Sequence, residues 1–266
     1  MRPFRRSYAV LTAATSAAAL ALAVSAPGQA ATTGWRAVVS HHYGAATNYS
    51  GYTAIAVPGP SDAWAFGCSG AGPGTGTWHF DGHTWTLVTG GAIGLVSASA
   101  VSAKNIWAIG STSAGPCGDM LTHYNGTSWQ PVTAPALSGL LFSAIVALSG
   151  TDVWAIAGNG SGGAAQLVHF NGSTWASVTV PYTRITLDYV APDGHGGFWL
   201  DSSSSLSKTT VLHYAATGVW SRAALTSGSM GPIALVPGTT SLWGVGSAAT
   251  TTPASNARTW EYGHAG

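Results

Sequence analysis

The stretch HFNGSTW, residues 169–175, places a histidine two positions before an Asn-Gly pair and a tryptophan three positions after it. An Asn-Gly pair between apolar residues predicts a tight β-hairpin, because both turn residues must accept a positive φ. The pattern returns as HYNGTSW at 123–129, as HFDGHTW at 79–85 and, one residue longer, as HYAATGVW at 213–220. The chain therefore repeats itself, and the repeat has to be interpreted before any single histidine.

A second run lies upstream of each hairpin and carries its own tryptophan. It reads DAWAFG at 62–67, NIWAIG at 105–110, DVWAIAG at 152–158, GFWLDS at 197–202 and SLWGVG at 241–246. A third run of small and β-branched residues precedes it, as in SASAVS at 97–102, and a turn follows. Units of 43 to 47 residues with four strands each are typical of β-propeller blades.

The number of copies predicts one five-bladed β-propeller of four-stranded antiparallel blades over residues 31–266. Four copies end in a strand that carries a tryptophan, whereas the fifth ends at RTWEYGHAG, 258–266, with no such strand left. Because ATTGW at 31–35 resembles AATGVW at 215–220, we expect a strand around Trp35 to Val39 to complete the last blade. This closure removes sheet edges that would otherwise template aggregation.

All twelve tryptophans fall on repeat positions, and the repeated histidines share one position. The second and fourth strands hold Trp35, Trp64, Trp85, Trp107, Trp129, Trp154, Trp175, Trp199, Trp220 and Trp243. The third strands hold Trp78, Trp260, the histidines His79, His123, His169 and His213, and Glu261 in the fifth copy. We interpret the tryptophans as packing groups, since each can bury about 150–250 Å². We expect the histidines to hydrogen-bond between blades or to the next turn, and a ring keeps them too far apart for one metal site.

Short polar residues mark the turns, because Asp and Asn side chains can bond their own backbone and fix a turn. Before the second strands stand Asp62, Asn105, Asp152 and Ser241, and at the hairpins stand Asp81, Asn125 and Asn171.

The first thirty residues have the order of a secretory signal peptide. Arginines at 2, 5 and 6 precede an uncharged stretch from about Ala9 to Val24, and Gly28-Gln29-Ala30 follows. We expect cleavage near Ala30 and a secreted mature domain. An uncleaved anchor is the alternative, but the apolar run is short for a membrane span of about 20 residues.

The composition favours neutral partners. Only 6% of the residues are charged and the net charge is +1, so the chain has no basic footprint for nucleic acid and no polybasic patch for a membrane surface. We expect a monomer without cofactor or metal. Cys68 and Cys117 lie in loops that a propeller places on the same face of neighbouring blades, and we predict that they form a disulfide in an exported chain.

The pattern DxWAxG followed by H(F/Y)(D/N)GxxW resembles the repeats of secreted bacterial β-propeller proteins, similar in style to kelch and galactose-oxidase-type propellers. The resemblance covers essentially the whole mature chain. Neither the copper ligands of the oxidases nor the arginine triad of sialidases has a counterpart here, and the double glycine of kelch repeats is irregular. The resemblance therefore implies a fold and no activity.

Function is expected where the blades differ. Asp201 stands where the other copies have Phe66, Ile109, Ile156 and Val245, and Asp188 stands where they have Ala54, Ala98, Ile145 and Ile233. Because a buried carboxylate needs a partner, the preceding Arg184 is a candidate for pairing. Asp188 and Tyr189 are candidate ligand-binding residues on a strand that lines the predicted channel, and Arg184, just before that strand, is a third. Asp188, Asp201 and Asp119 are weak candidates for the two carboxylates of a glycosidase, about 5–10 Å apart.

The loop SHHYGAATNYSGY at 40–52 adds His41, His42 and Tyr43 as candidate ligand contacts. The sequence thus favours a secreted, non-catalytic recognition module for a neutral glycan or for a cell-envelope or other extracellular protein partner. A glycan-acting enzyme and a purely structural interaction propeller are the alternatives.

Overall fold

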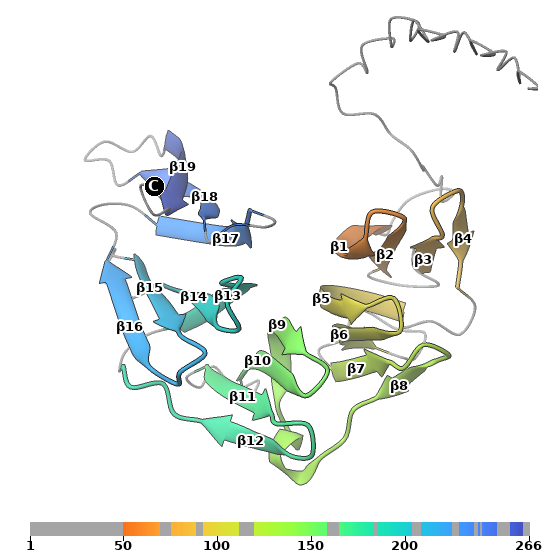
Figure 1. The fold of residues 1–266 in the computed structure, drawn as a ribbon, viewed down its shortest axis with the longest axis horizontal. Coiled ribbons are helices and arrows are strands. Elements are labelled where there is room, and N and C mark those ends of the chain that lie inside the picture. The colour runs from red at the N-terminus through yellow and green to blue at the C-terminus, as the bar shows by residue number, and fades with distance from the viewer. Residues whose placement is uncertain are drawn as a thin grey trace, which may run out of the picture. The chain divides into compact units, whose positions relative to one another are not determined.

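Antiparallel strands joined by turns make up nearly all of the described chain (Figure 1). The structure is a computed structural model, and it describes residues 50–69, 76–88, 93–111, 120–158, 165–182, 186–203, 209–224, 229–236, 239, 241–248 and 256–262. All of them lie in one unit, His41–Gly266.

The strands form four four-stranded sheets and one three-stranded sheet, each in sequence order. The first sheet comprises β1 (Ser50–Gly59), β2 (Asp62–Ser69), β3 (Thr77–Phe80) and β4 (Trp85–Leu87). The second comprises β5 (Ile93–Ser102), β6 (Asn105–Ser111), β7 (Met120–Tyr124) and β8 (Trp129–Pro131). The third comprises β9 (Leu141–Ser149), β10 (Asp152–Gly158), β11 (Gln166–Phe170) and β12 (Trp175–Val178), after the 3-10 helix η1 (Pro135–Leu137). The fourth comprises β13 (Thr186–Pro192), β14 (Phe198–Ser203), β15 (Thr209–Tyr214) and β16 (Trp220–Ala224). The last comprises β17 (Ser229–Leu235), β18 (Leu242–Ala248) and β19 (Asn256–Tyr262).

The second strand keeps one register in every sheet. Its tryptophan is paired with the first and third strands as Ala56–Trp64–His79, Ser99–Trp107–His123, Val146–Trp154–His169, Ala191–Trp199–His213 and Ala234–Trp243–Glu261. In every sheet the pairing between the first and second strands also shifts at a β-bulge in the first strand. The bulge lies close to the first-strand residue that faces the position two residues after the tryptophan. The sequence repeat is therefore a repeat of backbone geometry.

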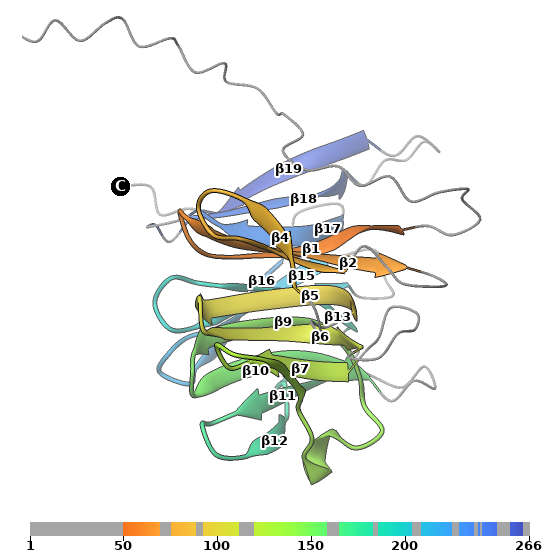
Figure 2. The same ribbon diagram turned by 90° about the vertical axis from the view of Figure 1, so that its right-hand side faces the viewer.

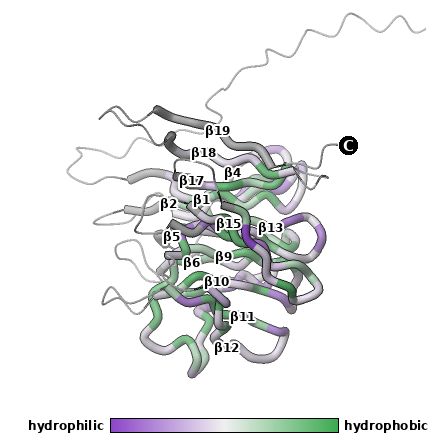
Figure 3. Tube along the Cα trace, turned by 90° about the vertical axis from the view of Figure 1, so that its left-hand side faces the viewer, coloured by the Kyte–Doolittle hydropathy of each residue, from purple (hydrophilic) through white to green (hydrophobic). Residues whose placement is uncertain are grey.

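Consecutive sheets pack face to face through apolar residues. Their first strands are neighbours, β1 with β5, β5 with β9, β9 with β13 and β13 with β17 (Figures 1 and 2). One side of each sheet carries the second-strand tryptophan and the residue two places after it, and we call this side the forward face. We call the opposite side of the sheet its receiving face. In the first interface Trp64 and Phe66 of the forward face pack on Leu95, Ile106 and Trp129 of the receiving face. Figure 3 shows hydrophobic stretches along these strands and hydrophilic residues in the turns.

Polar contacts also join the first strands of neighbouring sheets. The Thr53 hydroxyl of β1 donates to the Leu95 carbonyl of β5, and the Ser99 hydroxyl of β5 accepts a 3.0 Å hydrogen bond from the Ala147 amide of β9. Repeated four-stranded antiparallel sheets stacked in this way are the blades of a β-propeller, and the predicted all-β fold is confirmed at this level. The predicted closing strand around Trp35 lies outside the described residues.

Candidate functional site

The repeated histidine makes one recurring contact inside its own sheet. Its Nε2 atom lies 2.9–3.1 Å from a side-chain oxygen of the residue that begins the second strand. The pairs are His79–Asp62, His123–Asn105 and His169–Asp152. Of the two arrangements predicted for the histidine, a bond between blades is wrong for these pairs, because each partner belongs to the same sheet.

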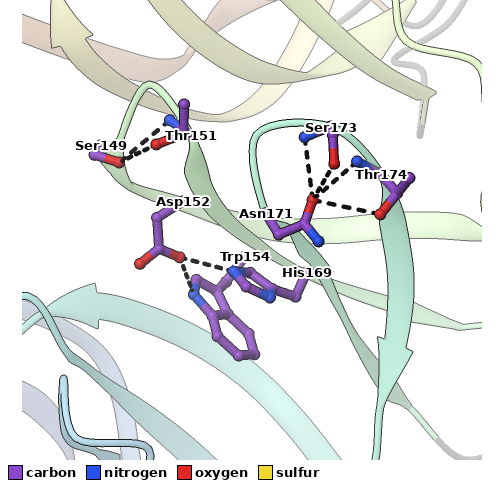
Figure 4. A network of polar contacts seen from close by, with 8 residues as sticks. All are labelled: Ser149, Thr151, Asp152, Trp154, His169, Asn171, Ser173 and Thr174. Carbon is purple, nitrogen blue, oxygen red and sulfur yellow. Dashed lines mark hydrogen bonds and ion pairs between the residues drawn. The ribbon is translucent and has the colours of Figure 1, made fainter.

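Each histidine also stacks on the second-strand tryptophan. The ring centroids are 4.3 Å apart for Trp64–His79, 4.1 Å for Trp107–His123, 3.9 Å for Trp154–His169 and 4.2 Å for Trp199–His213. In the third sheet Asp152 Oδ1 also accepts a 2.6 Å hydrogen bond from Trp154 Nε1 (Figure 4). The side-chain oxygen holds the edge of the imidazole ring, and the tryptophan indole packs on its face. The histidine thus links the third strand to the second strand and to the turn before it.

The fourth sheet uses a residue that sequence reasoning missed. His213 Nε2 bonds Asp193 Oδ2 at 2.8 Å, although the residue aligned with Asp62 and Asp152 is Gly197. Asp193 Oδ1 accepts the backbone amides of His195 and Gly197 at 2.7 and 2.8 Å. Burial by itself would raise the pKa of Asp193, but the hydrogen bonds from His213 and the two amides outweigh it and lower the pKa. The longer turn APDGHGG at 191–197 was the available signal.

The second sheet differs in charge, because Asn105 stands where the first and third sheets have Asp62 and Asp152. His123 is half-buried and has no carboxylate in this contact. Desolvation therefore lowers its pKa. This sheet keeps the geometry of the contact without the ion pair.

The hairpins between third and fourth strands are confirmed, but their loops have four residues. Phe170 pairs with Trp175, and Asn171 Oδ1 accepts the backbone amides of Ser173 and Thr174 at 3.1 and 2.9 Å (Figure 4). Gly172 has φ +92°. Asp81 and Asn125 repeat this capping in the first two hairpins. The side chain thus fixes the turn as predicted, in a loop twice as long as the Asn-Gly pair indicated.

The two candidate carboxylates of the fourth sheet occupy different positions in the strand register. Asp201 is fully buried in the forward-face slot of Phe66, Ile109 and Ile156, and it pairs across the strands with Tyr189.

Asp188 lies one residue earlier, between the pairs Leu187–Ser202 and Tyr189–Asp201, so it occupies the bulge. By register its equivalents are Thr53, Val96 and Ser143, and the predicted alignment with Ala54, Ala98, Ile145 and Ile233 is wrong. Periodicity could not place the bulge, which shifts every residue on one side of it.

Several predicted residues fall outside what the structure describes. They are Trp35, His41, His42, Tyr43, Cys117, Asp119 and Arg184, together with the side chains of Cys68, Trp260 and Glu261. The predicted disulfide and the Arg184 pairing therefore remain predictions.

An unpredicted site lies at the connection from the second sheet to the third. Pro135 begins η1, since its fixed φ suits a first helical position, and Leu137 is buried against the interface between the two sheets. On one side of this connection, Met120, Leu140, Leu141 and Phe142 line an open hollow of about 650 Å³.

A second hollow of about 550 Å³ lies on the other side of the same connection. Its apolar wall consists of Trp107, Phe170, Trp175 and Pro135, and its polar groups include Ser173 and Thr174. The rings form a cluster, with centroids 5.4 Å apart for Trp107–Phe170 and 5.3 Å for Phe170–Trp175. We call this hollow the aromatic hollow.

The hydroxyl groups at the aromatic hollow belong to the capped hairpin. Ser173 Oγ lies 2.9 Å and Thr174 Oγ1 lies 3.3 Å from Asn171 Oδ1 (Figure 4). Because that oxygen has two lone pairs and also accepts two backbone amides, the hydroxyl oxygens of Ser173 and Thr174 can accept hydrogen bonds from a ligand. No charged residue lines either hollow. The signal for this site in the sequence was TAPALSGLL at 133–141, a connection with its own proline and leucines.

Within the described part of the chain, no three His, Cys, Asp or Glu side chains gather as metal ligands. The same residues include no helix that is long and apolar enough to cross a membrane.

Comparisons with known proteins give distant likenesses. No protein-family model matches the chain, and no curated protein matches it. A structure of YCF48 bound to D1 peptide aligns with 17% identity over 75% of this chain and 65% of that chain, with a TM-score of 0.47. Streptogramin B lyase aligns with 13% identity over 81% and 73%, with a TM-score of 0.49. The six-bladed fucose-binding lectin of Aleuria aurantia aligns with 13% identity over 75% and 72%, with a TM-score of 0.46. This chain spans less than two thirds of the YCF48 chain, and no family or activity is assigned from these matches.

Proposed function

We propose that the protein is a non-catalytic recognition module for a neutral glycan, which binds in the aromatic hollow between the second and third sheets. The observation that carries this proposal is the combination of an aromatic wall, hydroxyl oxygens and an uncharged lining in one hollow. The proposal places the ligand at the longest connection between consecutive sheets, which runs from Pro131 to Leu141. It also agrees with the low charge of the whole chain.

The chemistry of the hollow suits a sugar ring. The C–H face of a pyranose can pack on Phe170 and Pro135, and its hydroxyl groups can donate to Ser173 and Thr174. An anionic ligand would meet no cation there. Trp107 and Trp175 are 5% and 8% exposed, so they support the wall from behind and Phe170 provides the accessible ring.

Calorimetry with neutral oligosaccharides, chosen by a glycan array, tests the proposal. We expect one equivalent to bind, and Ser173→Ala to weaken binding about tenfold, because one hydrogen bond contributes about 1–1.5 kcal/mol. Thr127→Ala removes the equivalent hydroxyl from the second hairpin and is the matched control, with binding unchanged. Five equivalents, or equal affinity in wild type and Ser173→Ala, would contradict this site, and no binding to any neutral glycan would contradict the ligand class.

The same assay addresses the enzymatic alternative that the sequence left open. Release of new reducing ends from a bound glycan, lost in Asp188→Asn, would replace the recognition module with a glycan-acting enzyme. Binding without turnover supports the module.

We also infer that the fold has five blades and that the strand around Trp35 to Val39 adds to the edge of β19. Support comes from the fifth sheet, which has three strands among the described residues where the other sheets have four. Deleting residues 31–40 tests this. We expect loss of cooperative unfolding, and a stable, folded monomer without these residues would contradict closure by this strand.

We propose secretion after cleavage near Ala30 and a disulfide between Cys68 and Cys117. The order of the first thirty residues supports export. Intact-mass measurement of the exported protein tests both proposals, through its N-terminal residue and through a mass increase on reduction and alkylation.

A further inference from the structure

The connection between the second and third sheets gives two hollows a common wall. Residues 132–135 line both the aromatic hollow and the hollow formed with Met120, Leu140, Leu141 and Phe142, which we call the apolar hollow. The wall is fixed at both ends. At one end the Val132 amide donates to the Leu121 carbonyl of β7 at 2.8 Å, and at the other Leu137 of η1 is buried in the core.

The apolar hollow differs in chemistry from the aromatic hollow. Met120 and Leu141 are 48% and 42% exposed, and Thr133 and Ser138 provide its polar side chains. No tryptophan, tyrosine or charged residue lines it. Leucine and methionine side chains, the latter flexible and adaptable, suit an alkyl or acyl chain better than they suit the hydroxyl groups of a sugar.

Met120 departs from the repeat at this place. It pairs with Gly110, three residues after the second-strand tryptophan, and the equivalent third-strand residues of the next two sheets are Gln166 and Thr210. The other sheets thus form their third strands with a polar residue at this position. Packing of the repeat does not require a half-exposed methionine there, whereas an apolar binding surface does.

We infer that one ligand occupies both hollows: a neutral glycoside whose sugar lies in the aromatic hollow and whose alkyl or acyl chain lies in the apolar hollow. The inference rests on the proposed glycan site and adds the class of its ligand. Thr133 is exposed and lines both hollows, so its hydroxyl group can donate to the oxygen that joins the sugar to the chain.

The linings favour a single amphiphilic molecule over a larger partner. The two hollows have volumes of about 550 and 650 Å³. Both lie within the range of about 300–1,000 Å³ that is usual for small-molecule sites. A membrane surface would need apolar side chains that project from the protein, whereas Met120 and Leu141 line a hollow. A polypeptide would bring backbone amides and carbonyls into a wall with few side-chain partners for them, at a cost in desolvation.

Calorimetry with the methyl and octyl glycosides of glucose, galactose and mannose, below their micelle concentrations, tests the inference. One fully buried methylene group tightens binding about fourfold. Because the hollow is open and covers only part of the chain, we expect the octyl glycoside of at least one sugar to bind at least tenfold more tightly than its methyl glycoside. A smaller gain with every sugar would overturn the inference.

Variants separate the two hollows. Leu141→Ser is expected to abolish the gain from the octyl chain and to leave binding of the methyl glycoside unchanged. Ser173→Ala is expected to weaken both glycosides alike and to keep the gain. Leu87→Ser removes a leucine that is 53% exposed in β4, outside the hollow, and is the matched control, with the gain kept. An unchanged gain in Leu141→Ser would overturn the inference alone, whereas unaltered affinities in Ser173→Ala would contradict the glycan site itself.

Oxidation of the unaltered protein removes any dependence on how the variants fold. Hydrogen peroxide converts an exposed methionine to its sulfoxide. Saturating octyl glycoside is expected to slow oxidation of Met120 at least fivefold, and methyl glycoside is expected to have little effect. Equal protection by the two glycosides would overturn the inference. Binding to phosphatidylcholine vesicles that carry no sugar, or a dimer that Leu141→Ser dissociates, would also overturn it, in favour of a membrane surface or a second copy of the chain.

Discussion

Replacing Asn105 with aspartate should turn the neutral contact of the second sheet into an ion pair. His123 Nε2 lies 2.9 Å from Asn105 Oδ1, and the equivalent residues in the first and third sheets are already aspartates. Asn105→Asp therefore adds a carboxylate at a distance where an opposite charge changes a pKa by about 1–3. We expect the pKa of His123, which desolvation lowers in the wild type, to rise by about 1 or more.

The change also reverses how this group couples stability to pH. A histidine whose folded pKa lies below its unfolded value of 6.5 costs stability as the pH falls through 6.5, because the unfolded chain binds the proton more readily. If the new carboxylate raises the folded pKa above 6.5, the variant gains stability below that pH and loses the gain as the pH rises through the folded pKa. A tenfold change in the proton affinity of the imidazole corresponds to about 1.4 kcal/mol of unfolding free energy.

Nuclear magnetic resonance titration of the His123 imidazole and thermal unfolding between pH 5 and 8 measure both effects. Asn171→Asp makes the same chemical change in a hairpin of the third sheet, and it should leave the titration of His123 unaltered. A His123 pKa that stays the same or falls in Asn105→Asp would refute the assignment of the contact.

Three further changes probe the sheets. Gly197→Ala pushes a methyl group against the Tyr214 carbonyl oxygen and Asp193, so it should destabilise the protein by about 2–3 kcal/mol in urea unfolding; a loss below about 0.5 kcal/mol would contradict that packing. Asp193→Asn should make the free energy of unfolding less dependent on pH in the acid range. The pKa of Asp193 is lowered from 3.8, and its contribution is present above that value and lost as the pH falls through the folded pKa, so wild type and variant should converge in acid. Ile156→Ala empties a fully buried forward-face position and should cost about 2–5 kcal/mol, and a cost near zero would mean that the face is not packed.

The repeated elements of the fold were predictable because their signals are local. The tryptophans of the second and fourth strands recur at fixed distances from the hairpin, and strand alternation then assigns them to one face. The sheets around Trp107 and Trp154 follow the predicted order. The hairpin loop was longer than predicted, since the capping of Ser173 and Thr174 by Asn171 is a side-chain contact that the Asn-Gly pair does not specify.

The candidate site was less predictable, for physical reasons that differ between residues. Asp193 reaches His213 from a turn extended by glycines, so spacing alone assigned its role to Gly197. A bulge moved Asp188 out of register with its assumed equivalents. The aromatic hollow arises where the 132–136 segment meets a hairpin of the next sheet, and contacts of this kind between distant segments leave no periodic trace in the sequence.

The contact between histidine and the turn before the second strand has a consequence for the order of folding. Its partners are 17 to 20 residues apart, whereas the hydrogen bonds that tie the first strands of neighbouring sheets join residues 42 to 48 apart. Shorter loops close at a smaller entropic cost, and local contacts speed folding. The strands of each sheet can therefore pair before the sheet packs against its neighbour. We expect the sheets to fold first as separate units and their packing against one another to be the slow step.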